Sequence, residues 1–276
     1  MKKIALTSLL AVFTASGAMA GNVIDGNPLY MPSKGHFYSV TSLESHTKND
    51  TPWTLGEEFG FGILDNWSVD FATAVTENKA FDNVSWNGFG LGTAFRMLDT
   101  NGWKLDLVGA YTVADLYNYP QPKPFDSWFD KGLTEYTWTA GVRGGFVASN
   151  WTLAGHAYFN YWNTESFNWD EDEGAQGIHT LTLGLDGQYV IDSNWSLLAT
   201  AEYTGYMDKE WFGTPGAKIK NAGEWAGELG VNYNIDSTKF VGAYINGSLN
   251  HRGGDNADEW EWNDGFGFGA KFGIDF

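Results

Sequence analysis

The last twelve residues of the chain, 265–276, alternate between two kinds of side chain. Because successive side chains of a strand point to opposite faces, this period of two predicts a β-strand and not a helix. One face is apolar enough for lipid or a protein core, and the other is small or charged. The apolar face holds Phe266, Phe268, Ala270, Phe272, Ile274 and Phe276, and the other holds Gly265, Gly267, Gly269, Lys271, Gly273 and Asp275.

The same alternation recurs along the chain, and short turns rich in Asn, Asp, Gly and Ser separate the alternating segments. These residue types favour tight hairpins. The turns lie at residues 64–67, 100–103, 148–151 and 192–195, and a fifth turn with a less similar sequence lies at residues 236–239. We predict strands near residues 36–45, 53–64, 67–76, 84–97, 103–114, 133–147, 151–162, 178–191, 195–205, 224–235, 239–250 and 265–276. The expected fold is therefore all-β, with about twelve antiparallel strands.

Four of the predicted strands have one face without any charge. These faces read Trp103, Leu105, Leu107, Tyr111, Val113; Trp151, Leu153, Ala157, Phe159, Tyr161; Leu181, Leu183, Leu185, Tyr189, Ile191; and Trp225, Leu229, Val231, Tyr233, Ile235. A soluble β-sandwich would bury such faces as well as a membrane would, so alternation by itself leaves both folds open.

The aromatic residues favour the membrane. A Trp follows each of four short turns, at Trp67, Trp103, Trp151 and Trp195, and on three of the strands a Tyr follows eight to ten residues later, at Tyr111, Tyr161 and Tyr203. At about 3.3 Å per residue and a tilt near 40°, this spacing spans roughly 20 to 25 Å, the height of the apolar band between the aromatic girdles of a membrane barrel. We therefore predict a closed transmembrane β-barrel.

The N-terminus has the features of a secretory signal peptide. Lys2 and Lys3 precede an apolar run over residues 4–13, and Ala18-Met19-Ala20 is a small-x-small cleavage site before Gly21. A single membrane anchor is the alternative, but the run is short for a spanning helix. We predict a signal peptide at 1–20 and a barrel at 21–276. Its lead-in, residues 21–34, contains Pro and Gly and is expected to be a periplasmic tail or a short plug.

Composition narrows the class of protein further. The chain has 34 acidic against 16 basic residues and a net charge of −18, which argues against binding to nucleic acid. It has no cysteine, which excludes disulfides and thiolate metal sites. After the N-terminus no apolar run is long enough for a membrane helix, whereas 17% aromatic residues and 35 glycines fit a barrel.

In its terminal Phe276, its signal peptide and its predicted strand number, the chain resembles bacterial outer-membrane β-barrel proteins of about twelve strands. This group includes nucleoside-specific channels and oligogalacturonate-type porins. The resemblance implies that Phe276 is part of the insertion signal for the barrel-assembly machinery, and that the partners are outer-membrane lipid and lipopolysaccharide. Short turns then face the periplasm, and residues 115–132, 163–177, 206–222 and 251–263 are extracellular loops.

Charged side chains at the alternating positions that face the lumen suggest the function of the barrel. The candidate selectivity residues are Asp70, Arg96, Asp106, Glu135, Arg143, His156, Asp186, Glu202, Glu224 and Glu228. Carboxylates outnumber basic groups there, which favours cations. Inward glycines at positions such as Gly88, Gly90, Gly92, Gly141 and Gly145 suggest a thinly lined wall and a narrow pore, although glycine also serves bends.

We therefore expect a channel for passive diffusion of small neutral or cationic solutes. The alternative is a non-conducting surface barrel that acts as an adhesin or structural protein, with lumen charges that only pair with each other. No nucleophile has an adjacent base, so we predict no enzyme, no catalytic residue and no cofactor. The acidic stretch 168–174 fails the EF-hand spacing, and both this stretch and the acidic stretch 255–264 are expected to be solvated. We predict no metal site, and binding of divalent cations or sugars by these stretches is the alternative. The sequence does not identify the solute or the oligomeric state.

Overall fold

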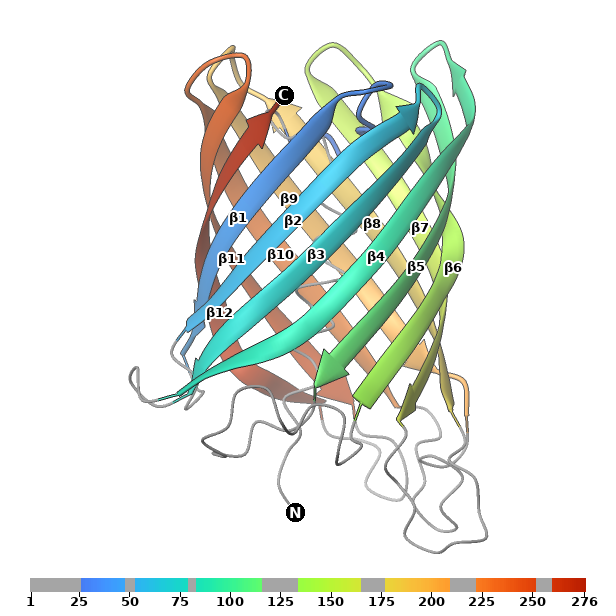
Figure 1. Cartoon of the computed structure of the whole chain (residues 1–276), viewed down its shortest axis with the longest axis vertical. Helices are drawn as coiled ribbons and strands as arrows, with labels where there is room; N and C mark the ends of the chain where they lie inside the picture. The colour runs from blue at the N-terminus through green and yellow to red at the C-terminus, as the bar shows by residue number, and fades with distance from the viewer. Residues whose placement is uncertain are drawn as a thin grey trace, which may run out of the picture.

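The structure is a computed structural model that describes residues 26–47, 53–78, 83–115, 134–164, 177–208, 222–251 and 260–276. It has twelve strands: β1 (Phe37–His46), β2 (Trp53–Leu64), β3 (Trp67–Asn78), β4 (Asn83–Thr100), β5 (Trp103–Asp115), β6 (Thr134–Val147), β7 (Trp151–Thr164), β8 (Ile178–Val190), β9 (Trp195–Tyr206), β10 (Gly223–Asn234), β11 (Lys239–His251) and β12 (Trp260–Asp275). All are antiparallel to their neighbours and close into one barrel (Figure 1). The predicted all-β barrel is confirmed.

The barrel closes where the first strand meets the last. β1 pairs with β12 from Tyr38 opposite Asp275 to His46 opposite Gly267. Beyond this ladder the backbones of Phe37 and Phe276 exchange two hydrogen bonds, of 3.3 and 2.8 Å, and their rings stack with centroids 4.4 Å apart. Closure leaves no strand edge with unpaired backbone groups, which is the condition for a sheet in hydrocarbon.

Local turn chemistry sets the hairpins. Between β4 and β5, Asn101 and Gly102 have φ of 50° and 83°, the left-handed pair of a tight two-residue turn. Elsewhere an aspartate caps the turn: Asp192 Oδ1 accepts hydrogen bonds from the backbone N–H groups of Asn194 and Trp195 at 2.8 and 2.9 Å. The equivalent bond from Thr238 lowers the pKa of Asp236 to about 2.

Strand ends differ from the prediction by more than two residues at two places. β4 extends to Thr100 and not to residue 97, because the two-residue turn lets pairing with β5 run to the last residue, past a bulge at Arg96/Leu98. β12 begins five residues before residue 265, because β11 continues to pair with it beyond a bulge at Gly247/Ser248. The signal peptide, most of the predicted long loops and acidic stretch 168–174 lie outside the described residues.

The two faces of the wall differ as the alternation predicts. Leu153 and Leu229 point outward and are exposed over 53% and 60% of their surface, whereas Asp106 and His156 point inward and are buried. The short hairpin turns and the C-terminus lie together at the upper end in Figure 1, here called the short-turn end. Among the described residues there is no helix long and apolar enough to cross a membrane.

Candidate functional site

The described part of the lead-in lies inside the barrel at the short-turn end. In this inner segment, residues 26–32, the side chains of Pro28, Leu29, Met31 and Pro32 are buried. Gly26 lies so close to the Leu198 side chain of β9 that a Cβ would collide with it, while Leu29 reaches β4 on the other side. Four strands separate β4 from β9 on one side and six on the other, so the segment crosses the lumen.

Two arginines of the wall hold the inner segment through its backbone. Arg96 Nη2 donates to the carbonyl oxygen of Leu29 at 2.5 Å, and Arg143 Nη2 donates to that of Tyr30 at 3.1 Å. The Tyr30 hydroxyl donates to Asp275 on β12 at 3.2 Å. The segment therefore has three polar attachments to three different strands, and it has the contacts expected of a plug and not those of a free tail.

The same arginines form a buried ionic cluster with Asp106, which is fully buried. Arg96 Nε and Nη2 donate to the two oxygens of Asp106 at 2.8 and 3.1 Å, and Arg143 Nε donates at 2.9 Å. One carboxylate on β5 thus serves two guanidinium groups on the two strands that flank it, β4 and β6. The cluster of Arg96, Asp106 and Arg143 has one net positive charge. The Nη2 groups of its two arginines also donate to the carbonyl oxygens of the inner segment.

Most other predicted lumen charges are also paired. His156 lies 2.8 Å from Asp186 and 3.4 Å from Glu202, and Lys271 donates to Glu228 at 2.9 Å. Glu224 lies on the inner parity of β10. Only the backbone of Glu135 is described, opposite Ala114 on β5. The wall is therefore a set of local ion pairs and not a ring of bare carboxylates.

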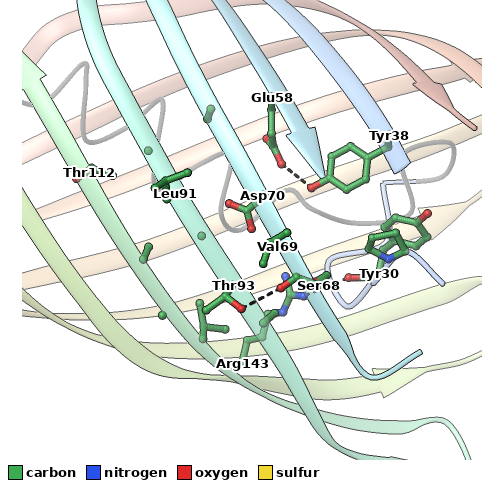
Figure 2. Close-up of a pocket in the computed structure, with 18 residues that line it drawn as sticks. Tyr30, Tyr38, Glu58, Ser68, Val69, Asp70, Leu91, Thr93, Thr112 and Arg143 are labelled. Carbon is green, nitrogen blue, oxygen red and sulfur yellow. Dashed lines mark hydrogen bonds between the residues drawn. The ribbon is translucent and has the colours of Figure 1, made fainter. Parts of the chain in front are cut away.

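A cavity of about 80 Å³ lies between this wall and the inner segment (Figure 2). Tyr30 and Pro32 line it from the segment, and β1 to β6 supply the rest, including Glu58, Asp70 and Arg143. Glu58 accepts one hydrogen bond, from the Tyr38 hydroxyl at 2.7 Å.

Asp70 is the exception among these carboxylates. It accepts no hydrogen bond and forms no ion pair with any residue that the structure describes, and it lies over Gly92 of β4. Because Gly60 faces Asp70 across the β2–β3 ladder and Ala72 faces Glu58, the two acids are diagonal neighbours on the inner wall. Two acids of the inner wall that form no ion pair with any described residue therefore lie together at this cavity.

The expectation that inward glycines leave the wall bare is wrong at most of the positions where it can be examined. Each of these glycines lies under a side chain or against the backbone of a neighbouring strand, so a Cβ would collide with it. The covering groups are Tyr38 over Gly60, Asp70 over Gly92, Tyr158 over Gly141, Asn246 over Gly267, Tyr244 over Gly269 and Phe240 over Gly273, and the Leu153 carbonyl lies against Gly145. The glycines make room for large neighbours that lie flat on the wall.

We expect Gly60→Ala to destabilise the barrel by about 1 to 3 kcal/mol, since the new methyl group must push the buried ring of Tyr38 away. Urea unfolding of protein refolded into lipid vesicles measures this. Gly109→Ala is the matched control, because its nearest non-local atom, Thr93 Cγ2, is at an ordinary 3.6 Å. In a Tyr38→Ala background the cost of Gly60→Ala should vanish; an equal cost in both backgrounds would contradict the steric account.

Comparison with known proteins rests on structure alone, since no protein-family model and no curated protein sequence matches this chain. The NanC porin matches with a TM-score of 0.55 at 8% identity, over 86% of this chain and 98% of that one. The COG4313 outer membrane channel from Pseudomonas putida F1 matches with 0.55 at 11%, over 90% and 97%. The chain has the fold of an outer-membrane β-barrel.

A third structure of the same fold is the translocator domain of the autotransporter NalP from Neisseria meningitidis, with a TM-score of 0.52 at 11% identity, over 98% of this chain and 96% of that one. Whole barrels are therefore similar in architecture over nearly their full lengths. Identities this low support the fold and leave the solute open.

The predicted girdle residues lie on the outer face of this outer-membrane β-barrel fold. Trp67, Trp103, Trp151 and Trp195 are exposed next to the short turns, and Tyr111, Tyr161 and Tyr203 are half-exposed on the outer parity further along their strands. Five of these rings touch a Phe, Tyr or Trp ring of a neighbouring strand: Trp103 and Trp151 with Phe146, Tyr111 with Trp138, Tyr203 with Trp225, and Trp195 with Tyr233. Phe276 is exposed beside Phe37 at the barrel seam.

One polar site on the outer face was not predicted. Glu57 has the outward parity of Phe59, and its two carboxylate oxygens accept hydrogen bonds from the hydroxyls of Ser39 and Thr41 at 2.5 and 2.6 Å. Consecutive residues of a strand point to opposite faces. Because Glu58 faces the lumen, Glu57 must face outward, and the sequence could have predicted this. Two hydroxyl donors compensate this carboxylate for part of the hydration it loses.

Proposed function

We propose that this chain is an outer-membrane channel for the passive diffusion of small neutral or cationic solutes. The observation that carries the proposal is the closed barrel with an apolar outer face and a charged, hydrogen-bonded inner face. Two of the solved structures of this fold are described as a porin and an outer membrane channel. In this proposal the signal peptide directs export, Phe276 is read by the barrel-assembly machinery, lipid and lipopolysaccharide surround the outer face, and the short-turn end faces the periplasm.

Preference for cations is supported by the cavity on β2 and β3. There Glu58 and Asp70 have no basic partner within ion-pair distance among the described residues, whereas other acids of the lumen, such as Asp106, Asp186 and Glu228, are matched by Arg or Lys or by His156. Solutes that pass the inner segment therefore meet two carboxyl groups that no direct ion pair neutralises, which in their ionised form attract positive and repel negative charge.

The inner segment supports a second candidate function. Because residues 26–32 cross the lumen and are held by two arginines, the barrel is also consistent with a non-conducting surface protein, an adhesin or structural anchor. Recording from single molecules in planar bilayers separates the two functions. Discrete conductance steps are expected from the channel, and their absence would support the non-conducting barrel.

Selectivity gives a sharper test of the channel. In a potassium chloride gradient we expect a reversal potential of the sign that marks cation preference, and we expect Glu58→Gln and Asp70→Asn each to reduce it. Glu57→Gln is the matched control, because it removes the adjacent carboxylate on the outer face and should leave the reversal potential unchanged. Anion preference in the unaltered protein would contradict the charge argument.

A further inference from the structure

We propose that the cavity between the inner segment and β2–β3 is a binding site for the ammonium group of a small organic cation. The site consists of the carboxylates of Glu58 and Asp70, the rings of Tyr30 and Tyr38, and an apolar wall (Figure 2). This inference extends the proposed channel function and rests on it, since it identifies the class of solute that the lumen would take.

Charge balance points to a monovalent ligand. When both carboxyl groups are ionised, Glu58 and Asp70 contribute two negative charges, and the adjacent cluster of Arg96, Asp106 and Arg143 contributes one positive charge. The five groups therefore carry one net negative charge, which one monovalent cation neutralises. A divalent cation would leave a net positive charge in a partly desolvated site, where uncompensated charge is costly.

The acceptors match an ammonium group, which has three N–H donors. Both oxygens of Asp70 lack donors among the described residues, and Glu58 uses only one oxygen, for Tyr38. The rings of Tyr30 and Tyr38 meet edge to face with centroids 6.0 Å apart. Aromatic rings at a cation site add attraction through their negative faces.

The remainder of the cavity favours an alkyl-bearing cation over a bare metal ion. Ala72, Ala94, Val108 and Ala110 line it with apolar surface, which can cover carbon atoms but supplies no ligand oxygens. Hard cations take six or more oxygen ligands. In the described ranges no three His, Asp or Glu side chains are grouped to hold a metal ion. We therefore assign the site to a primary amine with a short alkyl chain.

The inner segment completes the site. Tyr30 and Pro32 are contributed by the segment, and the carbonyl of Tyr30 is held by Arg143, which also lines the cavity. A bound ammonium ion thus contacts both the wall and the segment. Binding stabilises the segment in its place across the lumen, and loss of the segment removes one side of the site.

Calorimetric titration of the full mature chain in detergent micelles with n-propylammonium chloride, at constant ionic strength, tests the inference. We expect saturable binding that Asp70→Asn and Glu58→Gln each weaken at least tenfold, and that Tyr30→Leu, which leaves every strand intact, weakens several-fold. Glu57→Gln should bind like the unaltered chain. Unchanged affinity in Asp70→Asn, or equal binding of sodium at the same site, would overturn the assignment.

The titration does not depend on conduction, so the two proposals can fail separately. A barrel that binds propylammonium but shows no conductance steps would retain the binding site and lose the channel function. A barrel that conducts cations but shows no saturable binding would retain the channel and lose the site.

Discussion

Deletion of residues 22–32 is expected to raise the single-channel conductance several-fold. The inner segment crosses the lumen from Leu198 on β9 to Arg96 on β4, and four of its side chains are buried. Because the barrel is closed by its own strands and not by this segment, its removal should widen the lumen where the segment crosses it without opening the wall. Conductance in planar bilayers, with the cleavage site retained before the deletion, measures the effect.

Ser33→Ala is the control for this deletion, since Ser33 belongs to the lead-in but is exposed. It should leave the conductance unchanged. A deleted chain that folds and conducts like the full chain would show that the segment does not obstruct the pathway. A deleted chain that folds without conducting would favour the non-conducting barrel.

Replacement of Asp106 by Asn is expected to cost the barrel about 3 to 5 kcal/mol of unfolding free energy. The carboxylate is fully buried and accepts three hydrogen bonds from Arg96 and Arg143. An amide would leave two buried guanidinium groups side by side with only the half-exposed Asp99, 3.6 Å from Arg96, as a counter-charge, and it would turn an N–H donor toward at least one of them. Urea unfolding in vesicles, followed by tryptophan fluorescence, measures the loss.

Asp99→Asn is the comparison substitution at an exposed ion pair of the same hairpin. Asp99 is bonded to Lys104 at 2.7 Å and lies 3.6 Å from Arg96, but half of its side chain is exposed, so the expected loss is below about 1 kcal/mol. If Asp106→Asn costs no more than Asp99→Asn, the guanidinium groups must be hydrated when the carboxylate is removed, and the cluster would not be the main attachment of the inner segment.

The fold was predictable because its signals are local. A period of two predicts a strand from the residues themselves, and turns such as Asn101-Gly102 can be recognised from two residues. The inner and outer faces followed from parity, and Asp106, Arg143 and His156 lie on the predicted inner face. The errors at the ends of β4 and β12 arise where bulges shift the register, which no local pattern predicts.

The organisation of the lumen was less predictable, because it depends on which strands are neighbours and in what register. Arg143 and Asp106 are 37 residues apart and meet only because β5 pairs with β6. The inner segment is held by its backbone carbonyls, which every residue has, so the side chains of the lead-in carried no signal for its position. The expectation that inward glycines leave the wall bare was wrong for the same reason, because the rings that cover these glycines belong to adjacent strands.

The pairs of glycine and large side chain also constrain how such a sequence can change over time. Tyr244 covers Gly269 and Phe240 covers Gly273, so β11 and β12 interlock at two points of one hairpin. A larger residue at either glycine is tolerated only after its partner has become smaller, and a smaller ring leaves a gap until the glycine is replaced. Related barrels should therefore exchange both members of a pair together, and the last hairpin should be inherited as a unit.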